Sequence, residues 1–138
     1  MIELKPREEK TATFTVGEAH TAAAFAERPD ESFPAVLSTP HLIGAMERTC
    51  AEIMTPHLTA GQMSVGAAID IQHKAPTGVG GQYHCHAVFL EKSGPLYWFE
   101  VSAADAAGTI GKGRIARAIV DEATILDRAA KSLEQASN

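Results

Sequence analysis

The sequence lacks the features of secreted, membrane and nucleic-acid-binding proteins. It has only two cysteines, Cys50 and Cys85, with no CxxC pair, so we expect two buried free thiols and no disulfide. Residues 1–10 hold no apolar signal core and no later stretch is long enough to span a membrane, which predicts a cytoplasmic protein without a membrane partner. A net charge of -5 with dispersed basic residues argues against a nucleic-acid partner.

Several sequence motifs of common enzymes are also missing. There is no GxSxG motif and no P-loop, and the glycines of residues 77–81 lack the strand and helix context of a dinucleotide site. We found no internal repeat, low-complexity tract or interdomain linker. A chain of 138 residues without such breaks predicts a single domain over residues 1–138.

The hydrophobic pattern predicts an α+β fold. A strand is predicted at residues 11–17, a long helix at Thr39 to Pro56, four strands in antiparallel succession at 64–74, 82–91, 96–105 and 110–121, and a weaker helix at 122–135. Residues 18–38 are ambiguous between strand, short helix and loop. A long central helix must then be buried by the concave face of an antiparallel sheet.

Glu47 is the most informative residue of the predicted helix. Thr39 and Pro40 have the chemistry of an N-cap followed by a proline at the first helical position. At about 100° per residue, Glu47 falls on the apolar arc, which also holds Leu42, Ile43, Met46, Cys50, Ala51, Ile53 and Met54. A buried carboxylate needs a partner, a raised pKa or a polar cavity. The alternative is a carboxylate at the edge of the arc that reaches water.

His73 is the second candidate catalytic residue. It ends an alternating strand with the same parity as Ile69 and Ile71, so its ring is predicted to face the helix that carries Glu47. A carboxylate beside an imidazole is a minimal general-base pair, in which Glu47 would hold the His73 ring. Thr39 could then be a nucleophile or polariser, or only the N-cap of the helix.

Four other positions carry weaker signals. Arg117 shares a face with apolar residues, so it could bind an anion or merely lay its stem on the sheet. Gly66, inside an alternating strand, indicates a bulge or the close approach of a ligand. Phe33 lies in a polar loop and could be a hydrophobic plug. His84 and His86 are spaced like two metal ligands, but no third ligand is evident, and we predict no metal site.

Three runs of the sequence resemble the hotdog-fold thioesterases, most closely the fluoroacetyl-CoA thioesterases: TPHLIGAMERTCAEIMTPHL, SVGAAIDIQHKAPTGVG and IGKGRIARAIV. The similarity covers roughly residues 30–130. It is specific, because Thr39, Glu47 and His73 stand where that family keeps its catalytic threonine, glutamate and histidine. The resemblance implies a hotdog fold and a homodimer, in which the sheets of two subunits join and the acyl-CoA lies at their interface.

The same resemblance implies roles for three further residues. Gly66 would lie beside the thioester, Arg117 would be the pocket arginine, and Phe33 would be an aromatic lid over the acyl group. Two positions depart from the family pattern. Pro40 replaces a glycine and Asp30 replaces a second lid phenylalanine, so the identity of the acyl group is left open.

The sequence thus predicts a cofactor-free acyl-CoA thioesterase. It would hydrolyse a short acyl-CoA, including halogenated or otherwise substituted ones, as a homodimer or a tetramer. The alternatives are a non-hydrolytic acyl-CoA binding protein that uses the same groove and a hotdog hydratase, which adds water to a double bond.

Overall fold

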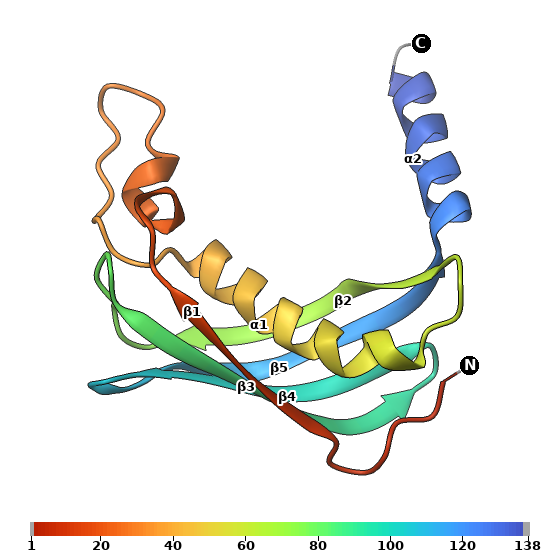
Figure 1. The fold of residues 1–138 in the computed structure, drawn as a ribbon. Helices are drawn as coiled ribbons and strands as arrows, with labels where there is room; N and C mark the ends of the chain where they lie inside the picture. The colour runs from red at the N-terminus through yellow and green to blue at the C-terminus, as the bar shows by residue number, and fades with distance from the viewer. Residues whose placement is uncertain (1, 137–138) are drawn as a thin grey trace.

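The protein is a curved antiparallel sheet wrapped around one long helix (Figure 1). The computed structural model describes residues 2–136. Its elements are β1 (Glu9–Thr15), η1 (Glu18–His20), η2 (Ala22–Phe25), α1 (Thr39–Met54), η3 (Thr55–His57), β2 (Gln62–His73), β3 (Gln82–Ser93), β4 (Leu96–Asp105), β5 (Gly108–Asp121) and α2 (Glu122–Ala136). The predicted α+β class and the central helix are confirmed.

The strands lie in the spatial order β1-β3-β4-β5-β2, and every neighbouring pair is antiparallel. The prediction of four strands in succession holds for β3, β4 and β5 only. β2 does not pair with β3, because residues 74–81 carry the chain across the sheet. β1 and β2 are therefore the two edge strands, and β2 leaves one side of its backbone unpaired.

Helix α1 buries a side that overlaps the predicted arc but is rotated from it, since Ile43, Glu47 and Ala51 are only half-buried. Its buried residues are Leu42, Ala45, Met46, Thr49, Cys50, Ile53 and Met54. The predicted N-cap is wrong by one residue. Ser38 is the cap, its hydroxyl accepts a hydrogen bond from the His41 backbone N–H, and Thr39 is the first helical residue. The capping role thus belongs to Ser38, which leaves the Thr39 hydroxyl free for another partner.

A β-bulge at Ala67 changes which residues of β2 face α1. Gly66 pairs with Arg117 and Ala68 with Ala116, so Ala67 is an extra residue in the ladder. Side chains of even number face α1 before the bulge, and side chains of odd number face it afterwards. The predicted inward direction of His73 therefore stands, whereas Val65 and Ala67 do not share its face.

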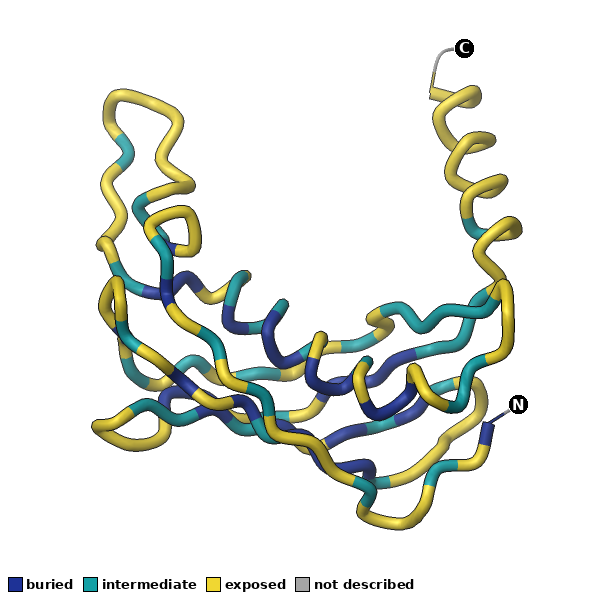
Figure 2. Tube along the Cα trace, in the orientation of Figure 1, coloured by how far each residue is buried: buried dark blue, intermediate teal, exposed yellow. Residues whose placement is uncertain are grey.

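Two segments rise from the same side of the sheet as α1, at opposite ends of the helix (Figure 1). One is residues 18–37, here called the lid segment, which contains η1 and η2 and resolves the ambiguity of this region in favour of short 3-10 turns. The other is α2, which confirms the predicted final helix. Figure 2 shows that both are exposed over most of their length.

Both cysteines lie in the core and are free thiols, as predicted. Burial raises the pKa of Cys50 to about 12 and that of Cys85 to about 12, so neither is a thiolate at neutral pH. Among residues 2–136, no helix combines the length and the apolar character that crossing a membrane requires.

Candidate functional site

Thr39 and His73 meet where the start of α1 lies over the end of β2. The distance from Thr39 Oγ1 to His73 Nδ1 is 2.8 Å, which is a good hydrogen bond. The two residues are 34 positions apart in the sequence. A hydroxyl bonded to an imidazole nitrogen is the arrangement by which a weak nucleophile or a bound water is activated.

The other ring nitrogen of His73 has a different environment. Nε2 is buried and has no hydrogen-bond partner among the described residues. Within residues 2–136 of the single chain, the predicted direct pairing of Glu47 with His73 is not formed, because Thr39 bonds to Nδ1 and no side chain bonds to Nε2. If Nδ1 accepts the hydrogen bond of Thr39, Nε2 carries the ring proton, which is the tautomer that a base acting through Nδ1 requires.

Glu47 has Arg117 as its partner instead. Arg117 Nη1 lies 3.7 Å from Glu47 Oε1, and the side chains are 9% and 28% exposed respectively. The sequence argument that a carboxylate on this arc needs a compensating group is thus confirmed. The two opposite charges compensate one another at a place where water has little access.

Gly66 allows the Glu47 carboxylate to lie directly against the backbone of β2. A Cβ atom at position 66 would overlap Oε1 of Glu47. Any other residue would push the carboxylate away from the strand. The close approach that the glycine indicated is real, although the group that approaches in this structure is Glu47.

Ser64 fixes the Arg117 side chain. Arg117 Nε donates to Ser64 Oγ over 3.0 Å, and Nη2 donates to the Ser64 carbonyl over 2.7 Å. Burial lowers the pKa of Arg117 while Glu47 opposes that shift, yet an arginine stays charged at any physiological pH. Sequence reasoning missed Ser64. The one available signal was its even-numbered spacing from Gly66, which the bulge made hard to interpret.

Phe33 lies on the lid segment, away from the buried core. It is 45% exposed, and Phe25 of the same segment is 48% exposed. The alternative of a buried hydrophobic plug is therefore wrong for the single chain. Its role as a cover for an acyl group stays a prediction.

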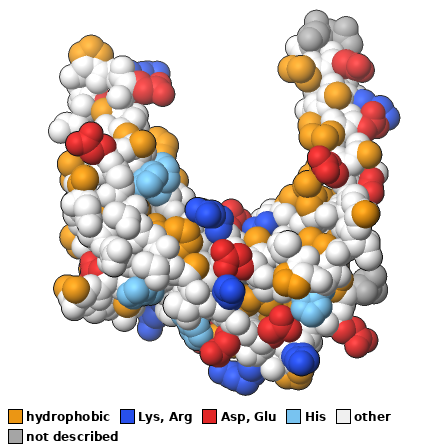
Figure 3. All heavy atoms as spheres, in the orientation of Figure 1, with side chains coloured by type: hydrophobic (Ala, Val, Ile, Leu, Met, Phe, Trp, Pro, Cys, Tyr) orange, Lys and Arg blue, Asp and Glu red, His pale blue; other side chains and the backbone are white. Residues whose placement is uncertain are grey.

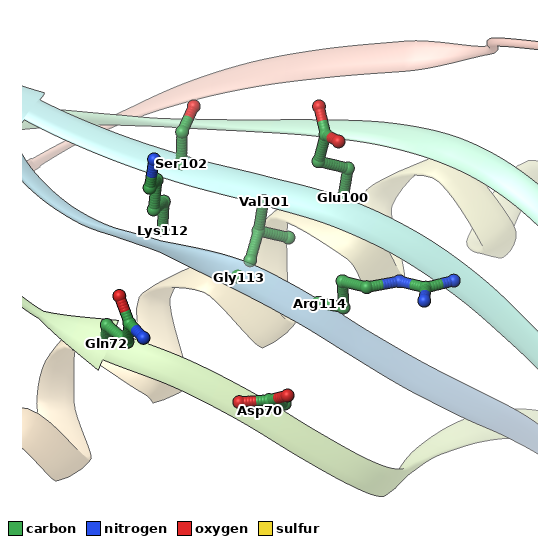
Figure 4. Close-up of a pocket in the computed structure, with 8 residues that line it drawn as sticks. All are labelled: Asp70, Gln72, Glu100, Val101, Ser102, Lys112, Gly113 and Arg114. Atoms are coloured by element: carbon green, nitrogen blue, oxygen red, sulfur yellow. The ribbon is translucent and has the colours of Figure 1, made fainter.

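A depression on the outer face of the sheet carries a second group of charged side chains (Figure 4). Its polar lining residues are Asp70, Gln72, Glu100, Ser102, Lys112 and Arg114. These residues project from the opposite side of the sheet to Thr39 and His73. The depression is therefore separate from the candidate site.

The two histidines of β3 have partners of their own. His84 Nδ1 lies 2.8 Å from Thr13 Oγ1, and His86 Nε2 lies 3.6 Å from Glu9 Oε2. Within residues 2–136, no group of three or more His, Cys, Asp or Glu side chains is placed to hold a metal ion.

Comparison with known proteins gives one consistent result. Residues 16–123 match the family described as fluoroacetyl-CoA-specific thioesterase. A curated relative, the fluoroacetyl-CoA thioesterase of Streptantibioticus cattleyicolor, is 34% identical over 97 residues, which is 70% of each chain.

Solved structures agree with the sequence match. The structure of the fluoroacetyl-CoA thioesterase FlK superposes with a TM-score of 0.88 at 29% identity, over 94% of this chain and 97% of that one. A Thermus thermophilus member of the thioesterase superfamily superposes with a TM-score of 0.84 at 22% identity, over 99% of each chain, and supports the fold alone. The chain has the hotdog fold and belongs to the fluoroacetyl-CoA-specific thioesterase family.

Proposed function

We propose that this protein hydrolyses a short acyl-CoA thioester to a free acid and CoA. The observation that carries the proposal is the 2.8 Å hydrogen bond between Thr39 and His73. The family membership supports thioester hydrolysis in particular. It also makes a substituted two-carbon acyl group, such as fluoroacetyl, the first substrate to test.

In the proposed reaction, His73 is the base and Thr39 supplies the hydroxyl group. His73 Nδ1 takes the proton of Thr39 Oγ1, which attacks the thioester carbonyl, or of a water held by that hydroxyl. The C–S bond then breaks and His73 returns the proton to the CoA sulfur. In the covalent route, water afterwards releases the acid from Thr39.

The surroundings favour the charges that this reaction develops. Thr39 is the first residue of α1, and backbone N–H groups at a helix start stabilise negative charge on an oxygen. The Glu47 carboxylate lies on the same side of β2 and is proposed as the second catalytic group. Arg117 pairs with Glu47, and Gly66 lets the carboxylate approach the strand.

We further propose that the working unit is a homodimer joined along β2. This strand has 12 residues, its outer edge is unpaired, and Ile69 on its inner face is 47% exposed. Long exposed edge strands tend to pair with another chain. Continuing the sheet across β2 would also shield the open side of the Thr39–His73 pair.

We also propose a cytoplasmic location. The free thiols of Cys50 and Cys85 are typical of that compartment.

Release of free thiol from a panel of short, halogenated and aromatic acyl-CoAs tests the proposed function. Cys50 and Cys85 should stay unreactive in the native protein because burial raises the pKa of each to about 12. The reagent signal without substrate is the control. Binding without thiol release would indicate the acyl-CoA binding protein, and hydration of an enoyl-CoA without thiol release would indicate the hydratase.

A covalent intermediate is tested separately. Rapid mixing followed by acid quench and intact mass measurement should show an acylated protein if Thr39 is the nucleophile. The mass shift should disappear in Thr39→Ala. Turnover without any acylated species would assign the attack to water.

A further inference from the structure

Helix α2 is too exposed to be stable by itself. None of its 15 residues is buried, and within residues 122–136 only Ile125 is even half-buried. An isolated helix of this length is marginal in water, because helices gain most of their stability from packing an apolar face. Another surface is therefore expected to pack against α2.

The apolar residues of α2 form one stripe. Ile125, Leu126, Ala129 and Leu133 lie on one side of the helix, and Leu126 is 60% exposed. The opposite side carries charges, including Lys131, whose Nζ lies 3.1 Å from Asp127 Oδ2. Figure 3 shows hydrophobic side chains along the side of α2 that faces the hollow above α1.

The lid segment is the matching surface across that hollow. It presents Phe25 and Phe33, which are 48% and 45% exposed. Full burial of one large apolar side chain is worth about 1.5–3 kcal/mol, so leaving both rings in water forgoes a substantial stabilisation. Within one chain, however, α2 and the lid segment stand at opposite ends of α1 (Figure 1).

Strand β2 joins the bases of these two segments. At its end, His73 bonds to Thr39, and the Thr77 carbonyl just beyond it accepts the Leu37 backbone N–H. At its start, Gln62 pairs with Asp121, the residue before α2. The end of β2 therefore lies at the base of the lid segment, and the start of β2 lies at the base of α2.

If β2 pairs with the β2 of a second copy in antiparallel fashion, the two strands run in opposite directions. The two-fold axis of such a continuous sheet is perpendicular to the sheet, so both copies keep their helices on the same side. The start of β2 in one copy then lies beside the end of β2 in the other. This places α2 of each copy beside the lid segment of the other.

We infer that the apolar stripe of α2 packs against the lid segment of the second copy, around Phe25 and Phe33. The inference rests on the homodimer of the proposed function and adds to it. In this arrangement α2 of the partner supports the lid segment beside the proposed acyl site. Each site is thus completed by the partner, although the Thr39–His73 pair comes from one chain.

Hydrogen exchange on the full-length protein tests this contact. Leu126→Glu places a charge in the stripe, and Gln135→Glu places the same charge on the opposite side of α2 as the control. Backbone amides of residues 22–37 should exchange at least ten-fold faster in Leu126→Glu and remain unchanged in Gln135→Glu. Amides of β2 should stay protected in both variants, and sedimentation should still show a dimer.

A reciprocal variant keeps the test decisive if Leu126→Glu folds poorly. Phe25→Ser changes the lid segment, where the ring also lies 6.3 Å from the His41 ring of α1. It should speed exchange in the amides of residues 122–136 by a similar factor. Lid exchange that is unchanged in Leu126→Glu, or α2 exchange that is unchanged in Phe25→Ser, would overturn the inference. So would a monomeric wild type.

Two further readouts separate the possible outcomes. Thiol release by the wild type reports on the proposed function, so an active enzyme with an unaffected lid segment refutes only the α2 contact. Cosedimentation of the wild type with phosphatidylglycerol vesicles would assign the stripe to a membrane surface and also overturn the inference. No pelleting is expected.

Discussion

Arg114 and Arg117 stand three residues apart on β5 but on opposite faces of the sheet. Arg117 faces α1, is 7% exposed, and makes two hydrogen bonds to Ser64 and an ion pair with Glu47. The Arg114 side chain is 50% exposed, lies over the Trp98 ring and is 3.9 Å from Glu91. The same residue type thus has a fixed geometry on one face and a loose one on the other.

The difference follows from solvation. A buried charge must replace its lost water with fixed partners, which also hold it in one position. An exposed pair keeps its water, and its contribution is typically about 0–1 kcal/mol. We therefore expect matched substitutions on the two faces to have very different effects, although both faces carry a glutamate and an arginine.

The largest difference is expected between Glu47 on the inner face and Glu100 on the outer face. Glu47→Gln keeps the shape of the side chain but removes its charge, and turnover should fall by about a hundred-fold or more, as is typical of losing an acid–base group. Glu100→Gln on the outer face should leave turnover within two-fold. Thiol release measured on both purified variants decides this, and a Glu47→Gln enzyme within a few fold of wild type contradicts the assignment.

His73→Ala tests whether His73 is the base of the reaction. For the wild type, general-base catalysis predicts a rate that rises with pH, because only a neutral imidazole can accept a proton from Thr39. The variant should lose this limb of the pH profile along with most of its activity. The profile of kcat/KM between pH 5 and 9 is the measurement. A residual activity with an unchanged limb would place the base elsewhere.

Arg117→Lys should have an intermediate effect. Lysine keeps the charge but cannot reproduce the forked hydrogen bonds to Ser64, so Glu47 should lose its fixed position. We expect turnover to fall about ten-fold, the value of roughly one such hydrogen bond to a charged group. Arg114→Lys is the matched control and should behave as wild type in turnover and in melting temperature. Equal losses in both variants would remove the distinction between the two faces.

Phe33→Ala should have the smallest effect and should act on binding. Phe33 lies outside the core of the chain and can lose only its contact with α2 of the partner, so the melting temperature should change by no more than a few degrees. The KM for the best short acyl-CoA should rise several-fold, and the preference over longer chains should weaken, because one methylene is worth about 1–3 kcal/mol. A much lower melting temperature with preserved substrate ranking would instead make Phe33 a structural residue.

The sequence predicted the inward side chains well where a single periodic element determined them. Glu47 was found from the arc of one helix, and His73 from the alternation at the end of one strand. Both arguments need only local geometry. The class of fold followed from the same patterns, because one long helix and several strands leave few ways to bury their apolar faces.

The predictions failed where long-range contacts decide. Nothing local places Ser64 beside Arg117, which is 53 residues away, or assigns Thr39 rather than Glu47 to His73. The N-cap moved from Thr39 to Ser38 because both residue types can cap a helix. The place of β2 beside β5 depends on a crossover that strand patterns do not encode.

The bulge at Ala67 has a consequence for anyone who edits β2. The extra residue shifts the alternation of side chains along β2 by one position. Gly66 and His73 therefore face the same helix, although one has an even number and the other an odd number. Deleting Ala67 would preserve nearly all of the strand's composition and its length within one residue. It would also leave an even number of steps between Gly66 and His73, so a regular strand would still turn both residues toward α1 and only the bulge itself would be lost.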